Sequence, residues 1–77
     1  MYNVKVGEYY YYKQQTSKYH TFEGVIVVDI LKNNDEFVGA LVHKVENTAG
    51  WVTERINLWS EHIVKKISRE THPEYFL

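Results

Sequence analysis

Two apolar segments separated by four polar residues constrain the fold more than any other feature of the chain. Thr21–Leu31 (TFEGVIVVDIL) and Glu36–Val45 (EFVGALVHKV) are rich in β-branched residues, which fit the pleated surface of a sheet. Between them, Lys32–Asp35 (KNND) carries Asn and Asp, which tolerate the positive φ angles of tight turns. The pattern predicts a β-hairpin with Asn33 and Asn34 as its two-residue turn.

This turn fixes which residues face each other across the hairpin. The predicted pairs are Ile30–Phe37, Val28–Gly39, Ile26–Leu41 and Phe22–Val45 on one side, and Val27–Ala40, Val25–Val42 and Glu23–Lys44 on the other. Both faces are then apolar at the centre of the hairpin, which a half-exposed hairpin does not require. We favour a hairpin in a small, strongly curved barrel, with its second face covered by a loop or by the tail. The alternative is an exposed patch that binds a partner or a second copy of the chain, formed by Val25, Val27, Val38, Ala40 and Val42.

The rest of the chain predicts a single domain over residues 1–77, with a core at 2–67 and a tail at 68–77 that docks onto the core or stays mobile. Tyr2–Tyr12 is expected to be the first strand, Lys13–His20 a loop, Glu46–Gly50 a turn and Trp51–Arg55 a short strand. Ile56–Ser68 is ambiguous. Ile56, Trp59, Ile63 and Ile67 have helical spacing, but a tight turn at Asn57–Ser60 followed by a short strand fits as well.

The order of these segments resembles the SH3-like small barrels, the superfold shared by SH3, Tudor and KOW-type modules. The resemblance rests on Val6-Gly7-Glu8 in the first strand, a long polar loop, a long strand, a hairpin, and a strand that opens on Trp51. It implies a mainly β, five-stranded barrel with a 3₁₀ turn at Asn57–Ser60 before a closing strand at His62–Ile67. The alternative is a sheet with a C-terminal helix at 56–68. At the level of the fold, the resemblance implies a binding module.

Composition narrows the class of function. The chain has no Cys, and nine Lys and Arg stand against ten Asp and Glu for a net charge of −1, whereas nonspecific nucleic-acid binders usually carry a basic excess. No apolar run approaches the roughly 20 residues that span a bilayer, and MYNVKVGEYY lacks the order of a signal peptide, so a cytoplasmic protein is expected. Residues with AT-rich codons (Phe, Tyr, Met, Ile, Asn and Lys) total 28, against nine for Gly, Ala, Arg and Pro, which suggests a low-GC bacterium or one of its phages.

No catalytic or metal-binding motif is present, so neither an enzyme nor a cofactor is expected. The four histidines (His20, His43, His62 and His72) have spacings that match no zinc site. Ser60, Glu61 and His62 are sequence neighbours that do not converge on one point, and the four glycines are isolated rather than grouped in a phosphate loop.

The tyrosine run Tyr9–Tyr12 (YYYY) is the best functional candidate in the sequence. Successive side chains alternate along a strand, so we expect Tyr9 and Tyr11 in the core and Tyr10 and Tyr12 on the surface. The predicted partner-binding residues are Tyr10, Tyr12, Lys18, Tyr19 and His20 on this strand and loop, and Val25, Val27, Val38 and Val42 on the hairpin. The net charge favours a protein partner, which the domain recruits or inhibits. The alternative is a nucleic-acid-binding barrel in which bases stack on the tyrosines.

Overall fold

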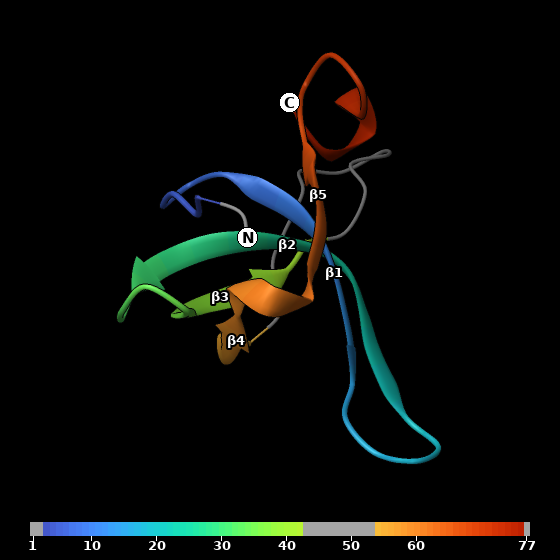
Figure 1. Ribbon diagram of the computed structural model, residues 1–77. Helices are drawn as coiled ribbons and strands as arrows, with labels where there is room; N and C mark the ends of the chain where they lie inside the picture. The colour runs from blue at the N-terminus through green and yellow to red at the C-terminus, as the bar shows by residue number, and fades with distance from the viewer. Residues whose placement is uncertain (1–2, 43–53, 77) are drawn as a thin grey trace.

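The computed structural model describes residues 3–42 and 54–76, and these form one five-stranded antiparallel sheet with two 3₁₀ turns (Figure 1). The elements are β1 (Tyr9–Gln15), β2 (Thr21–Leu31), β3 (Glu36–Leu41), β4 (Ile56–Trp59), η1 (Ser60–His62), β5 (Ile63–Ile67) and η2 (Pro73–Tyr75). The strand order is β4-β3-β2-β1-β5, and the two edge strands share no ladder within the described residues. The mainly β, five-stranded prediction is confirmed, but the sheet is not closed into a barrel by strand pairing.

Residues 56–68 form a strand, a 3₁₀ turn and a second strand, so the helical alternative is wrong. Pairing with distant strands decides the conformation: β4 lies against β3, and β5 pairs with β1 through Tyr9–Ile67 and Tyr11–Lys65. The 3₁₀ turn begins at Ser60 rather than spanning Asn57–Ser60. Glu54 and Arg55, predicted to end a strand that starts at Trp51, lie outside any strand, and residues 51–53 fall outside the described part of the chain.

The first hairpin is longer than the sequence predicts. β1 starts at Tyr9 and continues to Gln15, which reduces the predicted loop Lys13–His20 to residues 16–20. The eleven-residue β2 is long enough to pair with these polar residues, and Lys13 lies opposite Glu23. β2 bends strongly, and its first half forms with β1 an arm that extends away from the rest of the sheet (Figure 1).

The register of the second hairpin matches the prediction only on one side of a bulge. Pairs Ile26–Leu41, Val27–Ala40 and Val28–Gly39 are confirmed, and the Val42 N–H donates to the Val25 carbonyl at 2.8 Å. Asp29 is then an extra residue in β2, so Ile30 faces Val38 and Leu31 faces Phe37 instead of the predicted Ile30–Phe37 pair. The predicted partners Lys44 and Val45 lie outside the described residues.

The bulge also changes the turn. Asn33–Asp35 forms a three-residue connection, in which the Lys32 and Asn33 N–H groups donate to the Glu36 carbonyl at 3.0 and 3.1 Å. The Asn33 side chain accepts hydrogen bonds from the Asp35 and Glu36 N–H groups, each at 2.9 Å. No described residue other than glycine has a positive φ, so Asn33 acts through its side-chain oxygen and not through the backbone conformation that we expected.

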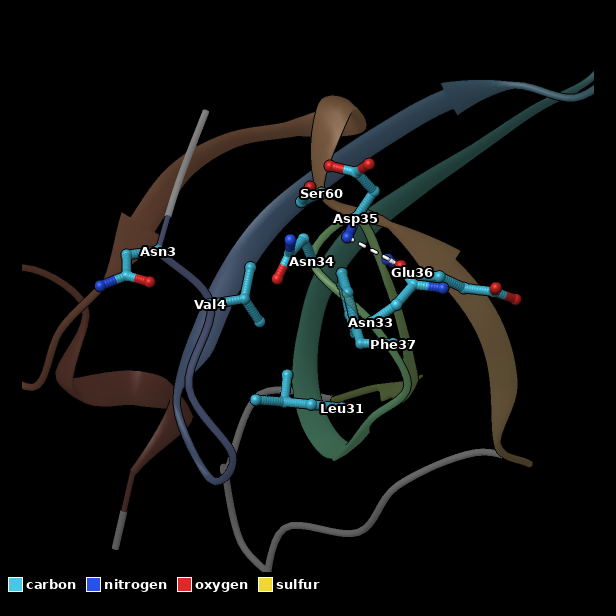
Figure 2. Close-up of a pocket in the computed structure, with 9 residues that line it drawn as sticks. All are labelled: Asn3, Val4, Leu31, Asn33, Asn34, Asp35, Glu36, Phe37 and Ser60. Atoms are coloured by element: carbon cyan, nitrogen blue, oxygen red, sulfur yellow. Dashed lines mark hydrogen bonds between the residues drawn. The ribbon is translucent and has the colours of Figure 1, made fainter.

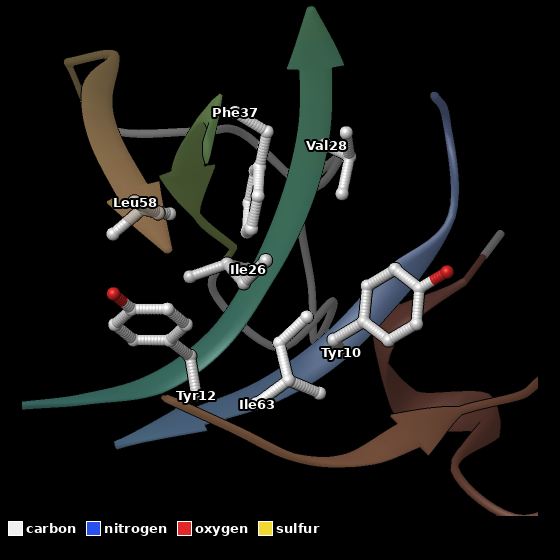
Figure 3. Packing of buried hydrophobic residues seen from close by; sticks show 7 residues of the cluster. All are labelled: Tyr10, Tyr12, Ile26, Val28, Phe37, Leu58 and Ile63. Atoms are coloured by element: carbon white, nitrogen blue, oxygen red, sulfur yellow. The ribbon is translucent and has the colours of Figure 1, made fainter. Parts of the chain in front are cut away.

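The main core lies on the concave face of the sheet, where five elements contribute side chains (Figure 3). The cluster comprises Tyr10, Tyr12, Ile26, Val28, Phe37, Leu58 and Ile63. Gly39 lies beside it, and a Cβ on this residue would approach the Val27 carbonyl oxygen to 2.6 Å, so the sheet requires glycine there. A small domain that lacks cysteine therefore fills its core mainly with aromatic and β-branched side chains.

A second apolar cluster lies on the other face of the sheet, which we call the outer face. Val25, Val42 and Ile67 are buried there, and Tyr75 and Phe76 from the tail pack against them. The Phe76 ring lies 4.6 Å from the Tyr9 ring, between centroids. The tail therefore covers part of the second apolar face, as the favoured interpretation of the hairpin predicts, and it is docked over its described residues.

Candidate functional site at the hairpin turn

The structure distributes the nine predicted partner-binding residues over three separate places and does not assemble them into one site. Tyr10 and Tyr12 are in the core, Lys18, Tyr19 and His20 are at the tip of the first hairpin, and Val25, Val27, Val38 and Val42 are on the outer face. Figure 1 shows the tip of the first hairpin far from the turn between β2 and β3.

The predicted faces of the tyrosine strand are reversed. Tyr10 is 2% exposed and Tyr12 0%, so neither ring offers a stacking surface in this conformation. The alternation itself is confirmed, but Tyr10 lies opposite Ile26 on the core side, which local sequence could not reveal. Burial raises the pKa of both phenols, while their hydroxyls bond at the edge of the core: Tyr10 accepts from the Lys5 N–H at 3.2 Å and Tyr12 from the Trp59 N–H at 3.1 Å.

Tyr9 and Tyr11, expected in the core, are half-buried on the outer face. Tyr11 donates a hydrogen bond to the Glu23 carboxylate, and this bond raises the pKa of the Tyr11 phenol. Beside Tyr11 is a hollow of about 460 Å³ whose charged lining mixes Glu23 and Glu74 with Lys65. Such a mixed lining gives no net attraction for phosphate groups.

The hairpin residues differ in how far they are covered. Val25 and Val42 are buried members of the second cluster, at 5% and 8% exposure, so they are not a free surface. Val27 and Val38 are half-buried. At the hairpin tip, Tyr19 is 82% exposed, and the Lys18 ammonium lies 5.5 Å from the centroid of its ring.

A pocket of about 140 Å³ lies where the turn between β2 and β3 meets η1 and the N-terminal segment (Figure 2). We call it the turn pocket; its lining residues are Asn3, Val4, Leu31, Asn33, Asn34, Asp35, Glu36, Phe37 and Ser60. The Ser60 N–H donates to the Asp35 carbonyl at 2.8 Å, which joins η1 to the turn. Ser60 is 2% exposed, and its hydroxyl has no hydrogen-bond partner.

Exposed apolar side chains lie at the same end of the hairpin as the turn pocket. Leu31, 47% exposed, forms one of its walls, and Trp59, 37% exposed, directly precedes Ser60 and pairs with Glu36. Ile30 is 56% exposed and lies opposite Val38, because the bulge at Asp29 turns Ile30 away from Phe37. This end of the hairpin therefore combines a polar pocket with apolar contact surface.

Over residues 3–42 and 54–76, no three His, Asp or Glu side chains are grouped closely enough to hold a metal ion. Within the same ranges, no helix has the length and apolar character needed to cross a membrane. The chain matches no family model, no curated protein and no solved structure.

Sequence reasoning missed Ile30, Leu31, Asp35, Trp59 and Ser60 as site residues. The exposure of Ile30 depends on the bulge, and the pocket depends on contact between η1 and a turn that is distant in sequence. The polar turn KNND was the only local signal, and by itself it is typical of an ordinary connection.

Proposed function

We propose that this chain is a small non-catalytic binding module that acts in the cytoplasm by contacting another protein through the turn pocket and the apolar side chains around it. The observation that carries the proposal is the exposure of Ile30, Leu31 and Trp59 at one end of the hairpin, each more than a third exposed. Aromatic and aliphatic side chains beside a pocket are typical of the anchoring regions of protein interfaces.

The strand order and the 3₁₀ turn between the last two strands support the finer proposal of an open SH3-like layout. In such modules function depends on the surface residues, and the fold alone supports only a binding role. A phage or prophage origin, with the chain modulating a host factor by occluding one of its surfaces, is the biological setting that we propose from the AT-rich codon bias.

Protein is favoured over nucleic acid because the proposed stacking platform is buried. Tyr10 and Tyr12 cannot stack on bases without leaving the core, and none of the nine described residues that line the turn pocket is Lys or Arg. One lysine and one arginine elsewhere are paired: Lys66 with Glu8, and Arg55 with Asp29 at 2.5 Å.

Affinity capture tests the proposal. The immobilised protein is exposed to lysate of a low-GC bacterium, and bound proteins are compared by mass spectrometry between wild type and Leu31→Lys, with Tyr19→Ala as a control at the distant hairpin tip. We expect a protein that is retained by wild type and Tyr19→Ala and lost with Leu31→Lys.

A parallel titration with single-stranded and duplex oligonucleotides at low salt addresses the other class of partner. Oligonucleotide affinity that falls steeply with added salt, together with equal capture by wild type and Leu31→Lys, would contradict the proposal.

A further inference from the structure

The polar end of the turn pocket contains a hydroxyl that needs a partner. Ser60 is held in place through its backbone by the Asp35 carbonyl, while its Oγ is buried and unsatisfied within the described residues. A buried polar atom without a hydrogen bond is rare in folded proteins, because it loses its bonds to water without replacement. The Ser60 hydroxyl can therefore form a hydrogen bond with a group that enters the pocket.

The groups around Ser60 define what this partner must be. In Figure 2 the Asp35 carboxylate and the Asn34 amide lie at the same end of the pocket as the Ser60 hydroxyl, whereas the Glu36 carboxylate points away. No Lys or Arg is among the nine described lining residues, and Asp35 forms no ion pair with any described residue. The ionised Asp35 carboxylate can only accept hydrogen bonds, and the Ser60 hydroxyl and the Asn34 amide oxygen can accept as well, so a cationic group rich in hydrogen-bond donors is complementary to this end of the pocket.

The other walls of the pocket suit an alkyl chain. Val4, Leu31 and Phe37 are apolar, and they line the same pocket as Asp35 and Ser60. Its volume of about 140 Å³ is close to the roughly 150 Å³ of a cavity that holds one benzene molecule, so it fits the head of one side chain and not an extended ligand. Arg and Lys side chains bury their methylene groups against apolar surface and keep the charged end on polar groups.

We propose that the turn pocket binds one arginine side chain of a protein partner. The guanidinium donates to the Asp35 carboxylate and the Ser60 hydroxyl, and its stem lies against Leu31 and Phe37. Arginine is preferred to lysine because its planar group presents five N–H donors in a fixed geometry, enough for two or three acceptors at once. The inference rests on the proposed protein-binding function and specifies the residue that is recognised.

The experiment is an NMR titration of the ¹⁵N-labelled full chain with four capped amino acids. The probes are the N-acetyl methylamides of arginine, lysine, citrulline and norleucine, where citrulline keeps the shape of arginine without its charge. We expect saturable shifts of the backbone amides of Asp35 and Ser60 and of the Asn34 side-chain amide with arginine, with a Kd of about 1–10 mM. Citrulline is expected to bind about fivefold more weakly, the upper range for a partly exposed charge pair.

Three variants locate the interaction. Asp35→Asn is expected to weaken arginine binding by about fivefold, and Ser60→Ala by about threefold to tenfold, while Asp29→Asn removes an equal charge elsewhere on the hairpin and leaves binding unchanged. Ser60→Ala also separates a binding role from a structural one. Because its hydroxyl has no partner in the described structure, its removal should leave the midpoint of urea unfolding equal or higher.

The proposal is overturned if citrulline binds as well as arginine, if Asp35→Asn has no more effect than Asp29→Asn, or if no probe gives saturable shifts below about 0.1 M. Protein capture that depends on Leu31 but not on Asp35 or Ser60 would overturn the arginine pocket and leave the proposed function standing. Selective arginine binding with no captured protein would support the arginine pocket and contradict the proposed function.

Discussion

Tyr12 connects three strands through a single side chain. Its ring makes edge contacts with Phe22 of β2 and Phe37 of β3, with centroids 5.8 and 6.5 Å apart. Its hydroxyl accepts the Trp59 N–H at 3.1 Å and donates to Gln14 Oε1 at 2.7 Å. In an open sheet, this bond from β1 to the end of β4 joins elements that share no ladder.

Removal of this ring is therefore expected to affect folding more than binding. Tyr12→Ala should lower the free energy of unfolding by about 3–5 kcal/mol, and Tyr12→Phe by about 1–3 kcal/mol because the Trp59 N–H is left without its acceptor. Urea unfolding followed by tryptophan fluorescence measures both values. Tyr19→Ala, at an exposed position, is the control and should change stability by less than about 0.5 kcal/mol. A stable Tyr12→Ala protein that fails to bind its partner would instead support the sequence-based prediction that Tyr12 is a binding residue.

The same burial predicts loss of stability at alkaline pH. The pKa values of Tyr10 and Tyr12 are raised above 10.0, mainly by desolvation, so the folded state holds these protons more tightly than the unfolded chain. Their contribution to stability is complete below about pH 10 and is lost as the pH rises through the raised values. Urea midpoints measured from about pH 8 to 11 should fall above pH 10, and they should fall less in a protein with Phe at both positions.

At the scale of elements, the sequence predicts those features that depend on neighbouring residues and not those that depend on pairing with distant strands. The bounds of β2 were predicted correctly because its apolar run and flanking polar residues are continuous in sequence. Local sequence does not decide the conformation of residues 56–68, because Ile56, Trp59, Ile63 and Ile67 satisfy two periods and only pairing with β1 and β3 selects between them. The bulge at Asp29 has no local signal, and the exposure of Ile30 could not be predicted without it.

Gly39 provides a test of the β2–β3 ladder. A Cβ at this position would lie 2.6 Å from the Val27 carbonyl oxygen, so Gly39→Ala must separate the two strands. We expect a loss of about 1–3 kcal/mol, with shifts of amide resonances along both strands. Gly7→Ala is the matched control: its Cβ meets nothing within 4 Å, although its φ of +85° adds strain. Its amide shifts should be confined to the turn before β1 and to the region of Val28, whose carbonyl accepts the Gly7 N–H at 2.8 Å. Equal shifts along the whole of β2 and β3 in both variants would contradict a close contact at Gly39.

At the scale of the whole molecule, the sheet is covered on both faces by different means. The sheet curves around the cluster on its core face. The outer face is partly covered by the tail, which packs Tyr75 and Phe76 against the second cluster. The Arg69 guanidinium lies 5.1 Å from the centroid of the Phe76 ring, and the His72 N–H donates to the Ser68 carbonyl at 2.8 Å, so the tail carries its own internal contacts.

Truncation after Ser68 should uncover Tyr9, Val25 and Ile67 together. Exposed contiguous apolar surface favours association, so we expect the truncated chain to self-associate at micromolar concentration while the full chain sediments as a monomer. Sedimentation velocity measures both species. Glu70→Ala, a change within the tail that removes no apolar contact, is the control and should remain monomeric. Association of the full chain that Val27→Lys abolishes would instead support the exposed hairpin patch.

The extra residue in β2 has an evolutionary consequence. Loss of the single codon for Asp29 would restore an unbroken ladder in which Ile30 still faces Val38 and Leu31 still faces Phe37, so neither side chain would change its face. The Asp29–Arg55 ion pair would be lost with the bulge, while Leu31 would stay in the wall of the turn pocket. A lineage of such proteins could thus gain or lose the bulge by insertion or deletion at this one position, while the residues of the core and of the contact surface stay the same.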